Sequence, residues 1–186
     1  MEKERGDMSE QKQSSFTIGP PEPGDELTIG PMQVQAWHEA YLHPELGVTD
    51  GVIQDAIEFV ATPEGNEFRK NLFSEMKSDP NKILYRVAKD SKGRVVGFMH
   101  CTKHEDSNEL GGIYLLDVAK GKGVGDQLME EFLAWSDTSK PTTLQVIAFN
   151  DRALSFYQKY GFEKSQKVLE PFKEKFPLVE MIKPAN

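Results

Sequence analysis

The chain has 186 residues, of which 38% are hydrophobic and 28% charged, and its net charge is -8. This length and composition are typical of one globular domain, and the acidic balance disfavours nucleic acid as a partner. No apolar run reaches the roughly 20 residues that span a bilayer, and no N-terminal stretch resembles a secretion signal. Cys101 is the only cysteine, so no internal disulfide can form, and we expect a cytoplasmic protein without a membrane partner.

Residues 1–15 contain no aliphatic side chain except two methionines and are rich in Glu, Lys, Gln and Ser. This composition is typical of a disordered tail. We therefore expect a tail over residues 1–15 and one domain over residues 16–186.

The first half of the domain is predicted to be mainly helical after a short strand. A strand is expected over residues 15–18, and Pro20, Pro21, Pro23 and Gly24 end it. Helical spacing then predicts helices over residues 25–41, 50–60 and 63–76. Because Gly30-Pro31 interrupts the first of these helices, we expect a break there.

The second half alternates strands and helices. Strands are predicted over residues 83–88, 95–101, 109–118, 142–149, 162–166 and 179–182, with helices after residue 123 and over residues 151–160. The residues from Asp90 to Gly93 have turn chemistry between the first two of these strands. The order predicts a mixed α/β domain.

A glycine-rich segment from Lys120 to Gly125 lies between a predicted strand and the next helix. Gly121, Gly123 and Gly125 allow backbone N–H groups to crowd together, and a helix N-terminus adds its positive dipole end. Such a turn suits a diphosphate, although the same glycines could serve only a tight turn. A Walker loop and a Rossmann fingerprint are both excluded by the spacing.

A second motif covers residues 150–162. Asn150 can cap the following helix, and Gly161 suits a position with positive φ at its end. Apolar residues at helical spacing between them would pack on the sheet. These packing roles do not by themselves require a tyrosine at position 157.

Together the two motifs resemble those of the GCN5-related N-acetyltransferase (GNAT) superfamily. Its first motif is Gln/Arg-x-x-Gly-x-Gly/Ala, and here Lys120 replaces the Gln or Arg. Its second motif is Asn-x-x-Ala-x-x-Phe-Tyr-x-x-x-Gly-Phe, which is matched at Asn150, Ala153, Phe156, Tyr157, Gly161 and Phe162. The resemblance extends from Phe16 to the C-terminus. It implies the GNAT fold, an α/β domain with a central, mostly antiparallel sheet flanked by helices, in which the strands on either side of the glycine loop and its helix splay apart.

The resemblance also implies acetyl-CoA as cosubstrate, with no metal, and transfer of its acetyl group to an amine through a tetrahedral intermediate. The pantetheine arm would contact the main chain of Leu115, Leu116 and Asp117. The remaining expected contacts with the cofactor come from Lys120, Gly121, Lys122, Gly123, Val124, Gly125 and Asn150.

Tyr157 is implied as the acid that protonates the departing thiolate. A base for the amine is not defined by the resemblance. Candidates on or near the central strands are Glu109, Asp117, His100 and His104, and we place Glu109 first.

The acceptor is expected between the N-terminal helices, over residues 37–76, and the loop over residues 167–177. Trp37 and Tyr41 are candidates for acceptor contacts through their π faces, although core packing would also explain them. The helical insertion resembles small-molecule amine acetyltransferases, including those acting on polyamines. Gln145 stands where acetyltransferases of ribosomal-protein N-termini carry Glu, which makes that activity less favoured.

Three alternatives stay open at this point: a protein lysine acetyltransferase, an N-terminal acetyltransferase, and a CoA-binding sensor without turnover. Dimers are common in the superfamily, so a homodimer is compatible with the chain, but no sequence run marks a dimer face.

Overall fold

The computed structural model describes residues 16–185, so the predicted tail over residues 1–15 lies outside the described residues. The strands are β1 (Phe16–Gly19), β2 (Ile83–Asp90), β3 (Val95–Lys103), β4 (Asn108–Leu115), β5 (Thr142–Ile147), β6 (Glu163–Lys164) and β7 (Leu178–Lys183). The helices are α1 (Asp25–Tyr41), α2 (Asp50–Ile57), α3 (Pro63–Ser78), α4 (Val124–Trp135) and α5 (Asp151–Lys159), with 3-10 turns η1 (Pro44–Leu46) and η2 (Glu58–Ala61).

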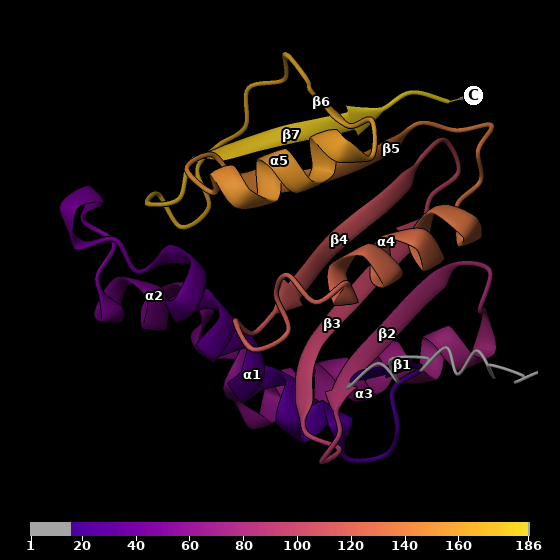
Figure 1. The fold of residues 1–186 in the computed structure, drawn as a ribbon, viewed down its shortest axis with the longest axis horizontal. Coiled ribbons are helices and arrows are strands. Elements are labelled where there is room, and N and C mark those ends of the chain that lie inside the picture. The colour runs from indigo at the N-terminus through magenta and orange to yellow at the C-terminus, as the bar shows by residue number, and fades with distance from the viewer. Residues whose placement is uncertain (1–15, 186) are drawn as a thin grey trace, which may run out of the picture.

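The strands form one sheet in the order β1-β2-β3-β4-β5-β7-β6, and only the β4–β5 pair is parallel. In Figure 1, α4 and α5 lie in front of the sheet and α3 lies behind it. This mixed α/β sheet with helices on both faces confirms the predicted fold class. None of the helices in residues 16–185 is long and apolar enough to cross a bilayer.

Local sequence signals explain where several elements begin. Thr62 accepts a hydrogen bond from the Gly65 N–H at 3.1 Å and so caps α3. Between β2 and β3, Asp90 accepts backbone bonds from Lys92 and Arg94 at 3.0 Å each. These bonds close the turn that the sequence predicts.

The predicted break at Gly30-Pro31 is wrong, because α1 runs without interruption. Pro31 cannot donate a hydrogen bond to the Leu27 carbonyl, but the Leu27 side chain is 58% exposed, so water can solvate this side of the helix. A Cβ at position 30 would lie 2.1 Å from the Val60 carbonyl oxygen. Gly30 therefore allows α1 to pack closely on η2.

The β4–β5 pair is short and opens at one end. Asn108, Glu109 and Leu110 pair with residues 142–144, and no pairing between these two strands follows. Across β4, the register with β3 shifts between His100 and Cys101, which leaves Gly111 as the extra residue. Because a bulge bends the strand that contains it, β4 turns away from β5 where their pairing stops.

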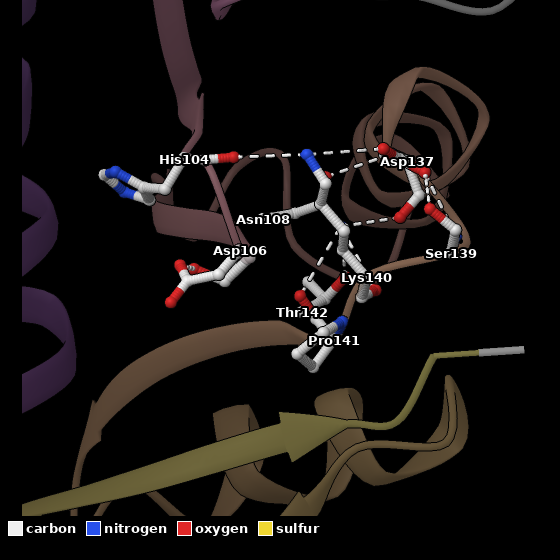
Figure 2. Close-up of polar contacts among 9 residues, drawn as sticks. His104, Asp106, Asn108, Asp137, Ser139, Lys140, Pro141 and Thr142 are labelled. Carbon is white, nitrogen blue, oxygen red and sulfur yellow. Dashed lines mark hydrogen bonds and ion pairs between the residues drawn. The ribbon is translucent and has the colours of Figure 1, made fainter.

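The paired end is held by a buried polar cluster, shown in Figure 2. Asn108 is fully buried, and its side-chain amide donates to the carbonyl of Asp137 at 2.9 Å and to the hydroxyl of Thr142 at 3.2 Å. Its Oδ1 accepts from the Asp137 N–H at 3.0 Å. The first residue of β4 is thereby tied to the loop between α4 and β5.

Candidate active site

Two cavities occupy the opening between β4 and β5. The loop-side cavity, of about 680 Å³, lies against the glycine loop and α5. The helix-side cavity, of about 590 Å³, lies against α1, α2, η2 and the loop after β6. Six residues line both cavities: Tyr41, Ile113, Tyr114, Asn150, Ala153 and Tyr157. The two cavities therefore adjoin at these residues.

The glycine loop, which lines the loop-side cavity through Gly121, Gly123 and Gly125, has unused N–H groups. Gly121 and Gly123 have φ values of 73° and 83°, in the left-handed region that glycine adopts without strain. Within residues 16–185, the N–H groups of Gly121, Lys122 and Gly123 have no hydrogen-bond acceptor. They adjoin the N-terminus of α4, whose dipole favours an anion. This arrangement is chemically suited to a diphosphate.

The lysines of the loop differ in position. Lys120 lines the loop-side cavity, and its ammonium pairs with Asp117 at 2.7 Å. Lys122 does not line the cavity, and its ammonium lies 5.6 Å from the centroid of the Phe16 ring. Val124 is buried in the core, so only its main chain could contact a ligand.

Arg152 and Lys159 of α5 also line the loop-side cavity, and sequence reasoning missed both. Arg152 is exposed and has no ion-pair partner among the described residues. Lys159 pairs with Asp126 at 2.6 Å. The sequence signal that could have identified Arg152 was a basic residue in the first turn of α5, two positions after Asn150.

Tyr157 lies at the junction of the cavities. Its side chain is 7% exposed, and its hydroxyl has no hydrogen-bond partner among residues 16–185. Burial raises the pKa of the Tyr157 hydroxyl, and the nearby Tyr41 and Tyr114 hydroxyls act in the same direction. The group is therefore a neutral phenol at physiological pH, available as a donor.

Asn150 links the two sides of the opening. Its Oδ1 accepts from the Ala153 N–H at 3.0 Å, which caps α5. Its Nδ2 donates to the Tyr41 hydroxyl at 3.3 Å. The second bond joins the start of α5 to the last turn of α1.

Aromatic rings line much of the helix-side cavity. Trp37 is 6% exposed and packs edge-on against Tyr41, with ring centroids 4.8 Å apart. Phe172, from the loop after β6, lies 5.8 Å from Trp37. Burial raises the pKa of Tyr114, which lines both cavities, to about 12.

Charged side chains on this cavity were also missed from the sequence. Asp55 and Glu58 line it from α2 and η2, and Lys173 lines it from the opposite loop. Gln145 lines it as well and carries no carboxylate. The carboxylates outnumber the ammonium group, so this wall favours a cation.

The candidates for the base are spread apart. Glu109 pairs with His104 at 2.8 Å, and neither residue lines either of the two cavities. His100 faces Gly111, where a Cβ would lie 2.1 Å from its ring nitrogen, and burial lowers the pKa of His100. Asp117 does line the loop-side cavity. Of the two residues assigned to catalysis from the sequence, the structure brings only Tyr157 to the junction.

Comparison with known proteins gives a family match over residues 80–164, to a model described as an acetyltransferase (GNAT) domain. No curated protein matches the chain. The solved structure of the PaiA N-acetyltransferase from Thermoplasma acidophilum in complex with coenzyme A is similar, with 21% identity, a TM-score of 0.72, and coverage of 91% of this chain and 99% of that chain.

Two further solved structures share the fold. The spermidine N-acetyltransferase from Vibrio cholerae, in complex with CoA and spermine, has 19% identity, a TM-score of 0.63, and coverage of 93% of this chain and 97% of that chain. The ribosomal-protein-S5-alanine acetyltransferase from Vibrio fischeri has 16% identity, a TM-score of 0.67, and coverage of 94% and 96%. The family match and the shared fold support the predicted GNAT superfamily and N-acetyltransferase class for this chain, whose residues 80–164 match the acetyltransferase (GNAT) domain.

Proposed function

We propose that the enzyme transfers the acetyl group of acetyl-CoA to a primary amine of a small cationic acceptor, such as a polyamine. The observation that carries the proposal is the meeting of two cavities of different chemistry at Tyr157. One offers free amides and cations, which suit a diphosphate. The other offers aromatic rings and carboxylates, which suit an organic cation.

The loop-side cavity would hold the cosubstrate. The N–H groups of residues 121–123 are free to bind the diphosphate. The Leu116 N–H already donates to the Val96 carbonyl at 2.9 Å. Because N–H groups alternate in direction along a strand, that of Leu115, the last residue of β4, points away from β3 and toward the opening, where the pantetheine arm would lie.

The chemistry requires an amine that has lost its proton. Its nitrogen attacks the thioester carbonyl carbon, the carbon–sulfur bond breaks, and CoA leaves as a thiolate. In our proposal Tyr157 gives its proton to that sulfur, the acylated nitrogen releases one proton to solvent to become the amide, and Tyr157 regains a proton from solvent through the open cavities. The raised pKa of the phenol keeps it protonated at physiological pH, so its proton is available when negative charge develops on the sulfur.

The acceptor would enter from the helix-side cavity. Asp55 and Glu58 would bind an ammonium group distant from the reacting amine, and the rings of Trp37 and Phe172 would face the connecting methylene chain. Cations also interact favourably with aromatic faces. A spermidine N-acetyltransferase is among the enzymes that share this fold, which agrees with such an acceptor.

The test is a panel of acceptors assayed for release of the CoA thiol. Spermidine, spermine, diamines of several lengths, neutral monoamines, amino acids, and peptides with a free N-terminus or lysine would be compared at equal concentration. We expect kcat/KM to be highest for acceptors with two or more ammonium groups. Faster turnover of peptides would contradict the acceptor class, and acetyl-CoA binding without turnover of any amine would indicate a sensor.

A further inference from the structure

The carboxylate of Glu39, in the last turn of α1, lies inside the loop-side cavity. Its Oε2 accepts a hydrogen bond from the Asp117 N–H at 2.7 Å, and the same oxygen lies 4.0 Å from the Lys120 ammonium. Its Oε1 accepts from the Gln35 side-chain amide at 2.7 Å. The side chain is 21% exposed, so it lies between the helix and the loop.

We propose that Glu39 is an internal competitor for the acetyl-CoA site, occupying the Asp117 amide in the free enzyme until the cosubstrate displaces it. This inference rests on the proposed function of the loop-side cavity. Asp117 lies in the turn that follows β4, and both Asp117 and Glu39 line the loop-side cavity.

The contact has the chemistry of a bound anion. A carboxylate accepting a backbone N–H forms a charge-assisted bond, which is stronger than a bond between neutral groups. The Lys120 ammonium lies close enough to attract the Glu39 carboxylate. The Asp117 carboxylate, 2.7 Å from the same ammonium, also neutralises it. Glu39 thus occupies the Asp117 N–H and partly neutralises the Lys120 ammonium. Both groups would otherwise be available to the cosubstrate.

The position of Glu39 allows it to be displaced. Within residues 16–185, the carboxylate of Glu39 contacts only the polar groups of Gln35, Asp117 and Lys120. A rotation of the side chain would carry the carboxylate into the solvent of the cavity without moving α1. The cosubstrate must therefore break one charge-assisted bond as it binds, and its measured affinity is reduced by that amount.

A structural role would predict the opposite effect. If Glu39 served to hold the β4 end in its binding geometry, then removing the carboxylate would loosen the loop and weaken binding. The two roles are separated by the direction of the change in affinity, which does not depend on turnover.

The experiment is calorimetric titration of the full chain with CoA and with acetyl-CoA. Glu39→Gln keeps the shape of the side chain and removes its charge, and Glu39→Ala removes the contact altogether. We expect Kd to fall in both variants, by about tenfold in Glu39→Ala, which is the size expected for one bond to a charged group. The matched control is Glu45→Gln, which changes the net charge equally at an exposed residue that lines neither cavity.

Unchanged or weaker binding by both Glu39 variants would overturn the inference while leaving the proposed function in place. Equal tightening in Glu45→Gln would also overturn it, because the effect would then belong to net charge. Absence of CoA binding by the unmodified protein would instead reject the proposed function, and this inference with it. Gln35→Ala, which removes only the bond that holds Oε1, should tighten binding by a smaller factor.

Discussion

Asn108 and Asp137 exchange two hydrogen bonds, with the Asn108 amide donating to the Asp137 carbonyl at 2.9 Å and its oxygen accepting the Asp137 N–H at 3.0 Å. The pair joins the start of β4 to the loop that enters β5 (Figure 2). Because β4 and β5 pair only over residues 108–110 and 142–144, this contact secures the closed end of the opening that contains both cavities.

Replacing Asn108 with Ala should destabilise the fold markedly. The change leaves the Asp137 N–H without its acceptor and removes the bond to Thr142 in a buried site. We expect the free energy of unfolding to fall by about 2–3 kcal/mol. Urea unfolding measures it, with Asn81→Ala as the control at an exposed position. A fall in the free energy of unfolding smaller than that of Asn81→Ala would contradict a stabilising role for the Asn108–Asp137 pair.

Replacing Tyr157 with Phe should reduce turnover without preventing cosubstrate binding. The phenol has no partner among the described residues, so its loss removes a proton donor and little else. We expect kcat to fall roughly 100-fold or more, the range for loss of a general acid, while the Kd for CoA stays within about twofold of the original. Steady-state kinetics and calorimetry measure the two effects.

The control for this variant is Tyr160→Phe on the same helix. The Tyr160 hydroxyl donates to Asp126 and does not line either cavity. A small fall in kcat for Tyr160→Phe and a large fall for Tyr157→Phe would identify Tyr157 as the proton donor. Unchanged kcat in Tyr157→Phe would reject the assignment.

Neutralising the carboxylates of the helix-side cavity should raise KM for a polyamine. Asp55→Asn and Glu58→Gln each remove one charge that faces the acceptor. We expect roughly a two- to fivefold rise in KM for each, the size of an exposed ion pair, and less at high salt. Lys173→Ala should lower KM, because it removes from the same cavity a positive charge that repels a cationic acceptor.

For these variants the matched control is Glu105→Gln, at an exposed residue outside both cavities. A KM for a neutral monoamine that rose as much as that for spermidine would argue against a charge-based role for Asp55 and Glu58.

The enzyme should lose stability at alkaline pH through its buried tyrosines. Burial raises the pKa of Tyr85, Tyr114 and Tyr157 above the value in the unfolded chain. A folded-state pKa above the unfolded one means that this stability is complete below about pH 10 and is lost as pH rises through the folded values. Each tyrosine should contribute up to about 1.4 kcal/mol per pH unit.

Urea unfolding from neutral pH to above pH 10 measures the slope, and tyrosinate absorbance reports the ionisation. Tyr85→Phe should make the slope shallower, because it removes one of the three groups. Tyrosinate appearing near pH 10 at all three positions of the folded protein would contradict the prediction.

Much of the fold followed from local patterns. The turn from Asp90 to Gly93, the cap at Asn150 and the apolar stripe of α4 each depend on residues within a few positions of one another, so the sequence predicts them. The break at Gly30-Pro31 was the wrong local prediction, because burial of the opposite face of α1 outweighs the missing hydrogen bond.

For the candidate site, too, local motifs predicted some residues and misplaced others. The glycine loop and Tyr157 belong to motifs with fixed spacing, so the sequence predicts their positions, and both line the loop-side cavity. Glu109 was placed first as the base, but its side chain pairs with His104 away from both cavities. Gly111-Gly112 was an available signal for the bulge in β4, since paired glycines in a strand are typical of one.

The amino-acid sequence alone predicted the superfamily and determined the order of the elements and the position of the glycine turn, because those properties depend on neighbouring residues and short periodicities. Only the tertiary structure decided which side chains meet in the opening between β4 and β5. Glu39 and Asp117 are 78 positions apart, and Asp55 and Lys173 come from segments far apart in the sequence that line one cavity. Contacts of this kind depend on how a bulge bends one strand and how helices pack on it, which no local pattern specifies.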